Sequence, residues 1–155
     1  MTTFVAQNFG AGKEDRIRKG FRIGMALEFC YWIIICGAVF LFREPLMRLF
    51  VTGEAADIVA LGSDYLGIMA FFYVFPGFTN GMQGYFRGRK HMKMTLLGTF
   101  IQTSLRVIFV YILVPRMGLK GVAFACAMGW SVMLAVEIPY YFHSRKVFSK
   151  RVTDS

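Results

Sequence analysis

The chain has 155 residues, of which 56% are hydrophobic and 17% aromatic, and its formal net charge is +9. This composition is far more apolar than that of an ordinary water-soluble domain, and it points to an all-α integral membrane protein. The positive charge alone would suggest nucleic acid as a partner, but the basic residues cluster between apolar stretches, which argues against that partner class.

The N-terminal segment reads as the end of a helix followed by a basic loop. In VAQNFGAGKEDRIRKG, Gly10 and Gly12 close a short mixed segment that opens onto a basic run. Helices often stop in this way at a membrane surface. We therefore predict that residues 1–20 are the end of a preceding helix plus a cytoplasmic loop.

Four long apolar stretches follow this segment. Each has the ~20 residues that a helix needs to cross ~30 Å of hydrocarbon. We predict transmembrane helices at residues 21–42, 62–86, 94–115 and 119–143, with a tail at 144–155. The last two connections are short, so neighbouring helices should be antiparallel.

The basic residues fall mainly into alternate loops. One side receives Lys13, Arg16, Arg18, Lys19, Arg22, Arg87, Arg89, Lys90, Lys93, Arg145, Lys146, Lys150 and Arg151. The other side receives only Arg43, Arg48, Arg116 and Lys120. By the positive-inside rule, both termini are expected in the cytoplasm of a multi-pass protein of the cell membrane.

Three charged residues lie within the predicted spans, namely Glu28, Arg106 and Glu137. A charged side chain inside a membrane is costly, so each is a candidate for the path of a substrate or an ion. By helix rise, the glutamates lie roughly 7–9 Å from the cytoplasmic edge and Arg106 roughly 18 Å. At that depth we expect the glutamates to face a hydrated cavity or the headgroups.

Pro76, near the middle of the second span, should kink its helix. It lacks an N–H donor and clashes with the carbonyl group of Phe72. Since Phe72 lies at nearly the same depth as Arg106, we hypothesise that Arg106 donates to this carbonyl or to the hydroxyl of Tyr73. Asn80 and Gln83, one turn apart on the same helix, either line a polar path or join helices by hydrogen bonds.

Small residues recur at intervals of four, which places them on one helix face and allows close packing. They are Gly77 and Gly81, Gly84 and Gly88, and Gly121, Ala125 and Gly129. The sequence shows no nucleophile with a placed base and no spacing of Cys or His typical of a metal site. We therefore expect no enzymatic activity, no metal and no cofactor.

Taken in order, these segments resemble the C-terminal part of the MATE (multidrug and toxic compound extrusion) family of transporters. VAQNFGAG, with Gln7, Gly10, Ala11 and Gly12, is similar to the end of the second helix of a six-helix half. DYLGIMAFFYVFPGF is similar to a later helix, and GMQGYFRGRKHMKMT, with Arg87 and Gly88, to a cytoplasmic loop. The resemblance covers essentially the whole chain.

The resemblance implies the last helices of the C-terminal lobe of a twelve-helix transporter whose N-terminal lobe is missing. It also implies export of small, amphipathic, often cationic compounds, driven by inward flow of sodium ions or protons. The second span has no carboxylate, so coupling is expected to depend on the missing lobe. We expect the fragment to be inactive alone.

Two alternatives remain open. A flippase for lipid-linked saccharides from the same superfamily should have a strongly cationic cavity, and only Arg106 offers such a charge. A self-sufficient four-helix drug exporter would use a membrane glutamate such as Glu28 to bind protons. Its dual-topology versions need a weak charge bias between loops, which this chain does not have.

Overall fold

The computed structural model of the protein describes residues 1–51 and 55–153, with side chains described as far as Ser144. The described residues form helices and no strands. In chain order these are α1 (Thr2–Gly10), α2 (Glu14–Arg48), α3 (Ala56–Phe72), α4 (Val74–Gly88), α5 (Met92–Met117) and α6 (Leu119–Thr153). The predicted all-α fold is confirmed.

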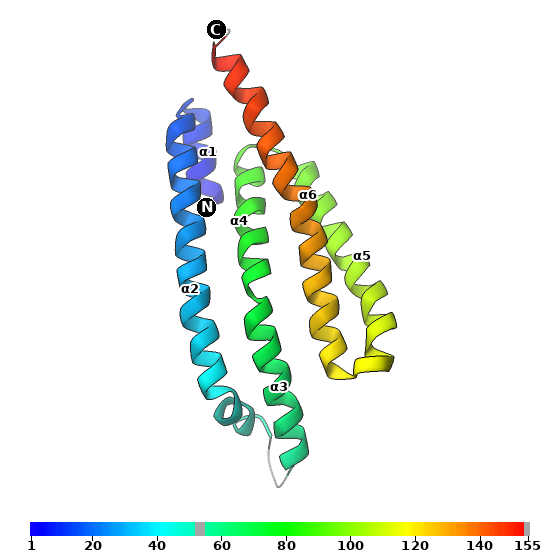
Figure 1. The fold of residues 1–155 in the computed structure, drawn as a ribbon. Coiled ribbons are helices and arrows are strands. Elements are labelled where there is room, and N and C mark those ends of the chain that lie inside the picture. Colours follow the sequence, from blue (N-terminus) through cyan, green and yellow to red (C-terminus); the bar gives the residue numbers. More distant parts are fainter. Residues whose placement is uncertain (52–54, 154–155) are drawn as a thin grey trace.

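Four helical segments are long and apolar enough to cross a membrane. They are α2, the α3–α4 pair taken as one rod, α5, and α6 as far as Ser144. Consecutive rods run in opposite directions, and short turns join α4 to α5 and α5 to α6 (Figure 1). The bundle therefore has two ends, and we call the one that carries α1 and the α4–α5 turn the α1 end.

The helices extend beyond the predicted spans. Helix α2 begins at Glu14, so the loop expected before the first span shrinks to residues 11–13. The same helix continues to Arg48, and α6 continues to Thr153 through the region predicted as a tail. Glu14 and Asp15 in the first turn of α2 complement the helix dipole, which favours this early start.

Buried side chains concentrate at the α1 end. Val5 of α1 and Phe21 of α2 pack there with Tyr85 and Phe86 of α4 and Tyr141 of α6. The ring of Phe21 lies 5.1 Å from that of Tyr85 and 5.1 Å from that of Tyr141, measured between centroids. This cluster, aromatic except for Val5, joins α1, α2, α4 and α6 and fixes their spacing at one end of the bundle.

Helices α5 and α6 form the closest pair. A Cβ atom placed on Gly121 would stand 2.7 Å from the backbone carbonyl of Leu113, and one on Gly129 would stand 3.0 Å from the carbonyl oxygen of Gln102. These two positions of the predicted small-residue face therefore let the backbones approach. Gly88 does the same for α4 and α1, where a Cβ would stand 2.5 Å from that of Val5.

Candidate functional site

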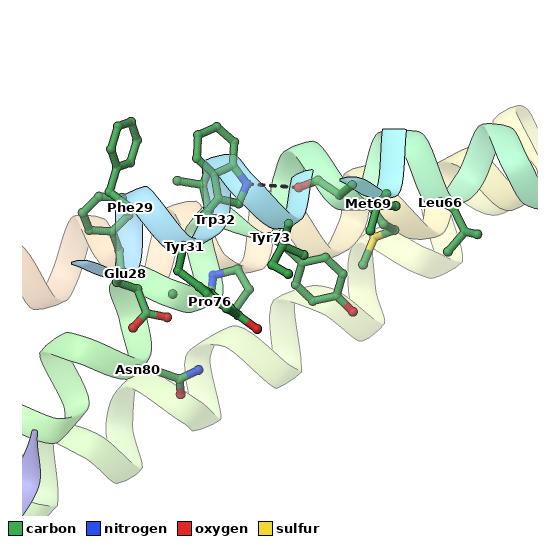
Figure 2. A pocket seen from close by; sticks show the side chains of 15 residues that line it. Glu28, Phe29, Tyr31, Trp32, Leu66, Met69, Tyr73, Pro76 and Asn80 are labelled. Atoms are coloured by element: carbon green, nitrogen blue, oxygen red, sulfur yellow. Dashed lines mark hydrogen bonds between the residues drawn. The ribbon is translucent and has the colours of Figure 1, made fainter. Parts of the chain in front are cut away.

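The candidate functional site is an apolar cavity between α2 and the α3–α4 rod (Figure 2). Its volume is about 360 Å³. Aromatic and aliphatic side chains make most of its wall, with Glu28 and Asn80 as polar exceptions. The aromatic residues that line it are Phe29, Tyr31, Trp32, Tyr73 and Phe78. A small amphipathic organic molecule is the kind of ligand that such a cavity accepts.

The cavity lies beside the break between α3 and α4. Pro76 has no N–H to offer the carbonyl group of Phe72, and the helix is interrupted at Tyr73. On α2, the indole Nε1 of Trp32 donates a hydrogen bond of 3.0 Å to the carbonyl oxygen of Ala70, in the last turn of α3. This bond ties α2 to the break and fixes the indole ring in the cavity wall (Figure 2).

A chain of aromatic rings connects α2 to both halves of the broken rod. The Trp32 ring lies 5.4 Å from that of Phe29 and 6.2 Å from that of Phe71 on α3. Phe29 in turn lies 6.3 Å from Phe78 on α4. Aromatic faces attract organic cations by cation–π interaction, so this wall suits a positively charged, flat ligand.

Glu28 supplies the carboxylate of the cavity. A Cβ atom placed on Gly77 would stand 3.2 Å from Oε1 of Glu28, so the carboxyl group lies directly over this glycine of α4. Asn80 follows three residues later on the same face of α4. Both side chains are exposed, and within residues 1–51 and 55–153 no hydrogen bond to the Glu28 carboxylate is formed. An exposed carboxylate beside apolar walls is suited to the charged group of an organic cation.

Gln83 does not share this cavity with Asn80. It is buried, its Nε2 donates to Thr99 Oγ1 on α5 at 3.2 Å, and its Oε1 accepts from Arg87 at 3.0 Å. Of the two roles left open, the structure thus gives Gln83 the helix-to-helix hydrogen bond. Asn80, three residues earlier on α4, is exposed at the cavity, whereas Gln83 is buried and does not line it.

The hypothesis that Arg106 serves the kink is wrong. Arg106 is exposed, and in the part of the chain that the structure describes it makes no hydrogen bond to Phe72 or Tyr73. Its Cβ lies beside Gly129 of α6, 3.7 Å from where a Cβ on that glycine would stand. Helix α5 packs on α6 and α4 but not on α3, so α6 separates Arg106 from the break. Arg106 and Phe72 were expected at the same depth in the membrane, but their side chains do not face each other.

Glu137 also differs from its expected setting. It was predicted to face a hydrated cavity or the headgroups, yet its side chain is 0% exposed. Both carboxyl oxygens are buried without a hydrogen-bond partner. A Cβ on Gly98 of α5 would stand 3.1 Å from Oε1, so the carboxyl group is enclosed where α5 and α6 meet. The prediction failed because distance from the helix end says nothing about which face is covered.

Arg89 is a buried cation at the α1 end that was not among the predicted site residues. Its side chain is 2% exposed, and its guanidinium lies 3.0 Å from the carboxylate of Glu14 at the start of α2. It also donates to the hydroxyl of Tyr85 and lies 5.3 Å from the ring of Phe9 on α1. Helical spacing from Tyr85 would have placed it on the buried face.

The residues of the family motifs form the connections around this cation. The amide of Ala11 donates to the carbonyl oxygen of Gln7 at 3.1 Å, and Gly12 adopts a φ of +67°, which closes the turn between α1 and α2. Gln7, Gly10 and Ala11 are exposed, as is Arg87. These motif residues thus shape the backbone rather than supplying buried side chains, and Gly88, which has no side chain, lies buried against α1.

His91, in the α4–α5 turn, is half-buried beside the same cluster. Its Nδ1 lies 3.3 Å from the hydroxyl of Tyr140 on α6. Burial lowers the pKa of His91 below the ordinary value of 6.5, and the nearby Arg89 guanidinium lowers it further. The imidazole is therefore held neutral more strongly than a solvated one.

No metal site is found among the described residues. They contain no group of three or more His, Cys, Asp or Glu side chains placed to bind an ion. The three cysteines are separate free thiols, with Cys30 exposed, Cys36 half-buried and Cys126 buried. The polar groups available to a ligand of the cavity are thus carboxylate, amide and hydroxyl.

A model of the MatE family matches residues 1–112. The chain belongs to the MatE family. It is 28% identical over 155 residues to "Probable multidrug resistance protein YpnP" of Bacillus subtilis, which is 99% of this chain and 34% of that protein. It is 27% identical over 124 residues to "Probable multidrug resistance protein NorM" of Thermotoga maritima, which is 78% of this chain and 26% of that protein.

A third relative, "Probable multidrug resistance protein NorM" of Pseudomonas aeruginosa, is 29% identical over 100 residues, 62% of this chain and 20% of that protein. The chain therefore spans between a fifth and about a third of the length of these MatE relatives. No solved structure matches it at a significant level. The predicted resemblance to MATE transporters is confirmed.

Proposed function

We propose that this MatE chain is part of a secondary active multidrug efflux transporter, and that the α2/α3–α4 cavity contacts its amphipathic, cationic substrates. One observation carries the proposal: an aromatic cavity of about 360 Å³ has an exposed carboxylate at its edge. The names of the relatives as multidrug resistance proteins support the same class of substrate.

Binding would divide between the cavity wall and its edge. The apolar part of a ligand leaves water against Trp32 and Phe29, where the indole face attracts its cationic centre. Glu28, which the helices of this chain leave uncovered, offers a negative charge at the edge of the cavity. Since both contacts are separate from the hydrogen bond that holds Trp32, binding does not require the wall to rearrange.

Energised export belongs to the larger protein in this proposal. The chain would supply one part of the substrate path, and a partner lobe would supply the opposite wall of the path and the alternating access driven by sodium ions or protons. We expect the purified chain alone, in sealed vesicles, to show no ion-driven accumulation of an organic cation. Sustained sodium- or proton-driven transport by the chain would refute this division.

We further propose that the chain lies in the cell membrane with its α1 end in the cytoplasm. The support is the concentration of Lys and Arg in the loops and termini of that end. A reporter that is active only in the cytoplasm should be active when it is fused after Ser155. Activity of a reporter that works only outside the cell would invert the orientation.

Fluorescence tests the cavity directly. The chain has two tryptophans, so Trp130→Phe leaves Trp32 as the single indole reporter. In lipid nanodiscs, added tetraphenylphosphonium should change the fluorescence emission of Trp32 until binding saturates. Glu28→Gln should weaken binding about threefold to tenfold, because one exposed charge pair is lost.

The matched control is Glu44→Gln, which removes another exposed carboxylate of α2 outside the cavity. Glu44→Gln should leave tetraphenylphosphonium binding unchanged. In a second control, an uncharged molecule of similar ring structure should bind Glu28→Gln and the unmodified chain equally well. An unsaturable response, or equal effects of the two substitutions, would count against the cavity as the binding site.

A further inference from the structure

Glu137 combines complete burial with a lack of partners. Its side chain is 0% exposed, and neither carboxyl oxygen has a hydrogen-bond partner among the residues that the structure describes. The group is closed in by Gly98 of α5 and by Met133 one turn earlier on α6, whose Cε would lie 3.2 Å from a Cβ on that glycine. The surroundings of the carboxyl group are thus small or apolar.

Among the described side chains, no positive charge is paired with this carboxyl group. Helix α6 packs on α3, α4 and α5. The charged or titratable groups of these helices, among the described side chains, are Asp57, Asp64 and Tyr65 on α3, Tyr73 at the break, Tyr85 and Arg87 on α4, Arg89, Lys90 and His91 in the turn, Lys93, Arg106, Tyr111 and Arg116 on α5, and Lys120, Cys126, Tyr140, Tyr141 and His143 on α6. Several of them have other partners: Arg87 binds Gln83, Arg89 binds Glu14 and Tyr85, Asp64 binds Lys120, and His91 meets Tyr140. Within the described side chains, none forms an ion pair or hydrogen bond with Glu137.

A second polar atom without a partner lies on the facing helix. Thr95 Oγ1 is buried and makes no hydrogen bond among the described residues. Thr95 precedes Gly98 by three residues, so both lie on the same face of α5. A protonated carboxyl group can both donate to and accept from a hydroxyl, whereas an ionised one can only accept. Among the described residues no hydrogen bond joins Thr95 to Glu137, so this hydroxyl stabilises neither form of the acid in this conformation.

An ionised carboxylate would be very unstable in this position. Transfer of an unpaired charge out of water is so unfavourable that such groups normally bind a proton instead. A metal cation is a poor alternative, because hard cations need several oxygen ligands and the described residues contain no group of three or more His, Cys, Asp or Glu side chains placed to bind an ion.

We propose that Glu137 is a proton-binding site enclosed between α5 and α6. In the conformation described here it is a neutral carboxylic acid. Release transfers its proton to a water molecule and leaves a carboxylate, and it requires water to enter between the two helices. Proton occupancy is therefore tied to the separation of α5 and α6.

This inference deepens the proposed function, on which it rests for its biological role, by assigning a proton to a residue of this chain. It is independent of the cavity at Glu28, which lies between other helices. A transporter that binds organic cations at that cavity but keeps Glu137 ionised would retain the proposed function and lose this inference.

Infrared spectroscopy of the whole chain in lipid nanodiscs tests the site. A protonated carboxyl group has a C=O stretching band that carboxylates lack. We expect this band in the unmodified chain at neutral pH, and we expect it to shift only slowly on transfer to D₂O, because α5 and α6 cover the group. Absence of the band, or an immediate shift, would overturn the proposal.

Two substitutions assign the band. Glu137→Gln keeps the shape of the side chain and should remove the band, whereas Glu28→Gln removes an exposed carboxylate and should leave it unchanged. A band that persists in Glu137→Gln would refute the assignment. Because the band is first measured in the unmodified chain, the test remains decisive even if Glu137→Gln folds poorly. Tetraphenylphosphonium binding, measured in parallel, reports separately on the proposed function.

Discussion

Glu28 and Glu137 lie in apolar spans at similar expected distances from the membrane edge, yet their environments are opposite. Glu28 is exposed at the edge of a cavity, over Gly77 of a neighbouring helix. Glu137 is completely buried over Gly98, without a partner. Each carboxyl group rests on a glycine, so the glycine alone does not decide the environment. What differs is how completely the surrounding helices cover the group.

The helices that carry the two glutamates differ in the same way. None of the 18 residues in the most apolar stretch of α2 is buried within the chain, whereas 44% of the residues in the corresponding stretch of α6 are buried. Among the described residues, α6 contacts α3, α4 and α5, whereas α2 contacts only α1 and the α3–α4 rod. A carboxylate on a peripheral helix stays open to a cationic ligand, while one enclosed on a central helix is driven to bind a proton.

The largest expected effect is that of Glu137→Arg. Arginine stays charged at any accessible pH, so the substitution forces an unpaired charge between α5 and α6. We expect the free energy of unfolding to fall by about 3–5 kcal/mol. The measurement is unfolding by sodium dodecyl sulfate in mixed micelles, followed by circular dichroism. Glu28→Arg is the control, and an equal loss there would abolish the contrast between the two sites.

The next effect is that of Gly129→Val. The added methyl groups meet the carbonyl oxygen of Gln102 and push α5 away from α6, which should cost about 1–3 kcal/mol of unfolding free energy. The same substitution at Gly37 of α2, where no atom lies within 4 Å of an added Cβ, is the matched control. If both variants unfold alike, close packing is not what distinguishes the α5–α6 interface.

A smaller effect is expected for Trp32→Phe at the cavity. It removes the hydrogen bond to the carbonyl oxygen of Ala70 and leaves that oxygen without this donor, which should cost about 1 kcal/mol. The same mixed-micelle titration measures it. Tyr31→Phe, a change at an exposed neighbour that lines the same cavity, should be nearly neutral. Equal stability of Trp32→Phe and the unmodified chain would show that the indole does not hold α2 against the break.

The smallest effect is a pH dependence of the unfolding free energy that comes from His91. This residue is half-buried, between the exposed Glu28 and the enclosed Glu137. Its pKa is lowered in the folded chain by burial and by Arg89, so the unfolded chain binds a proton more readily. The stabilisation from neutral His91 is therefore present above the unfolded pKa of about 6.5 and is lost as the pH falls.

His91→Gln should flatten this dependence when unfolding free energies are measured across mildly acidic pH. His143→Gln, at an exposed histidine, should leave the slope as it is. A slope that is the same in both variants would mean that His91 titrates as it does in water, and that half-burial at the α1 end has no electrostatic consequence.

Part of the candidate site was visible in the sequence. Glu28, Tyr73 and Asn80 stood out as polar groups in apolar spans, and Pro76 marked the break beside which the cavity lies. Trp32 was missed, because a tryptophan in a membrane helix is ordinary until a carbonyl such as that of Ala70 is known to lie beside it. Arg89 was missed although its spacing from Tyr85 signals a shared face.

The sequence by itself determined the all-α membrane fold, the number of long apolar rods, the break near Pro76 and membership of the MatE family. These depend on hydropathy, helix rise and residue order, all of which run along the chain. Only the tertiary structure decided that Arg106 faces away from the break, that Gln83 joins α4 to α5, and that Glu137 is enclosed. The reason is that depth is fixed by counting residues along one helix, whereas the covered face is fixed by which helix packs beside it.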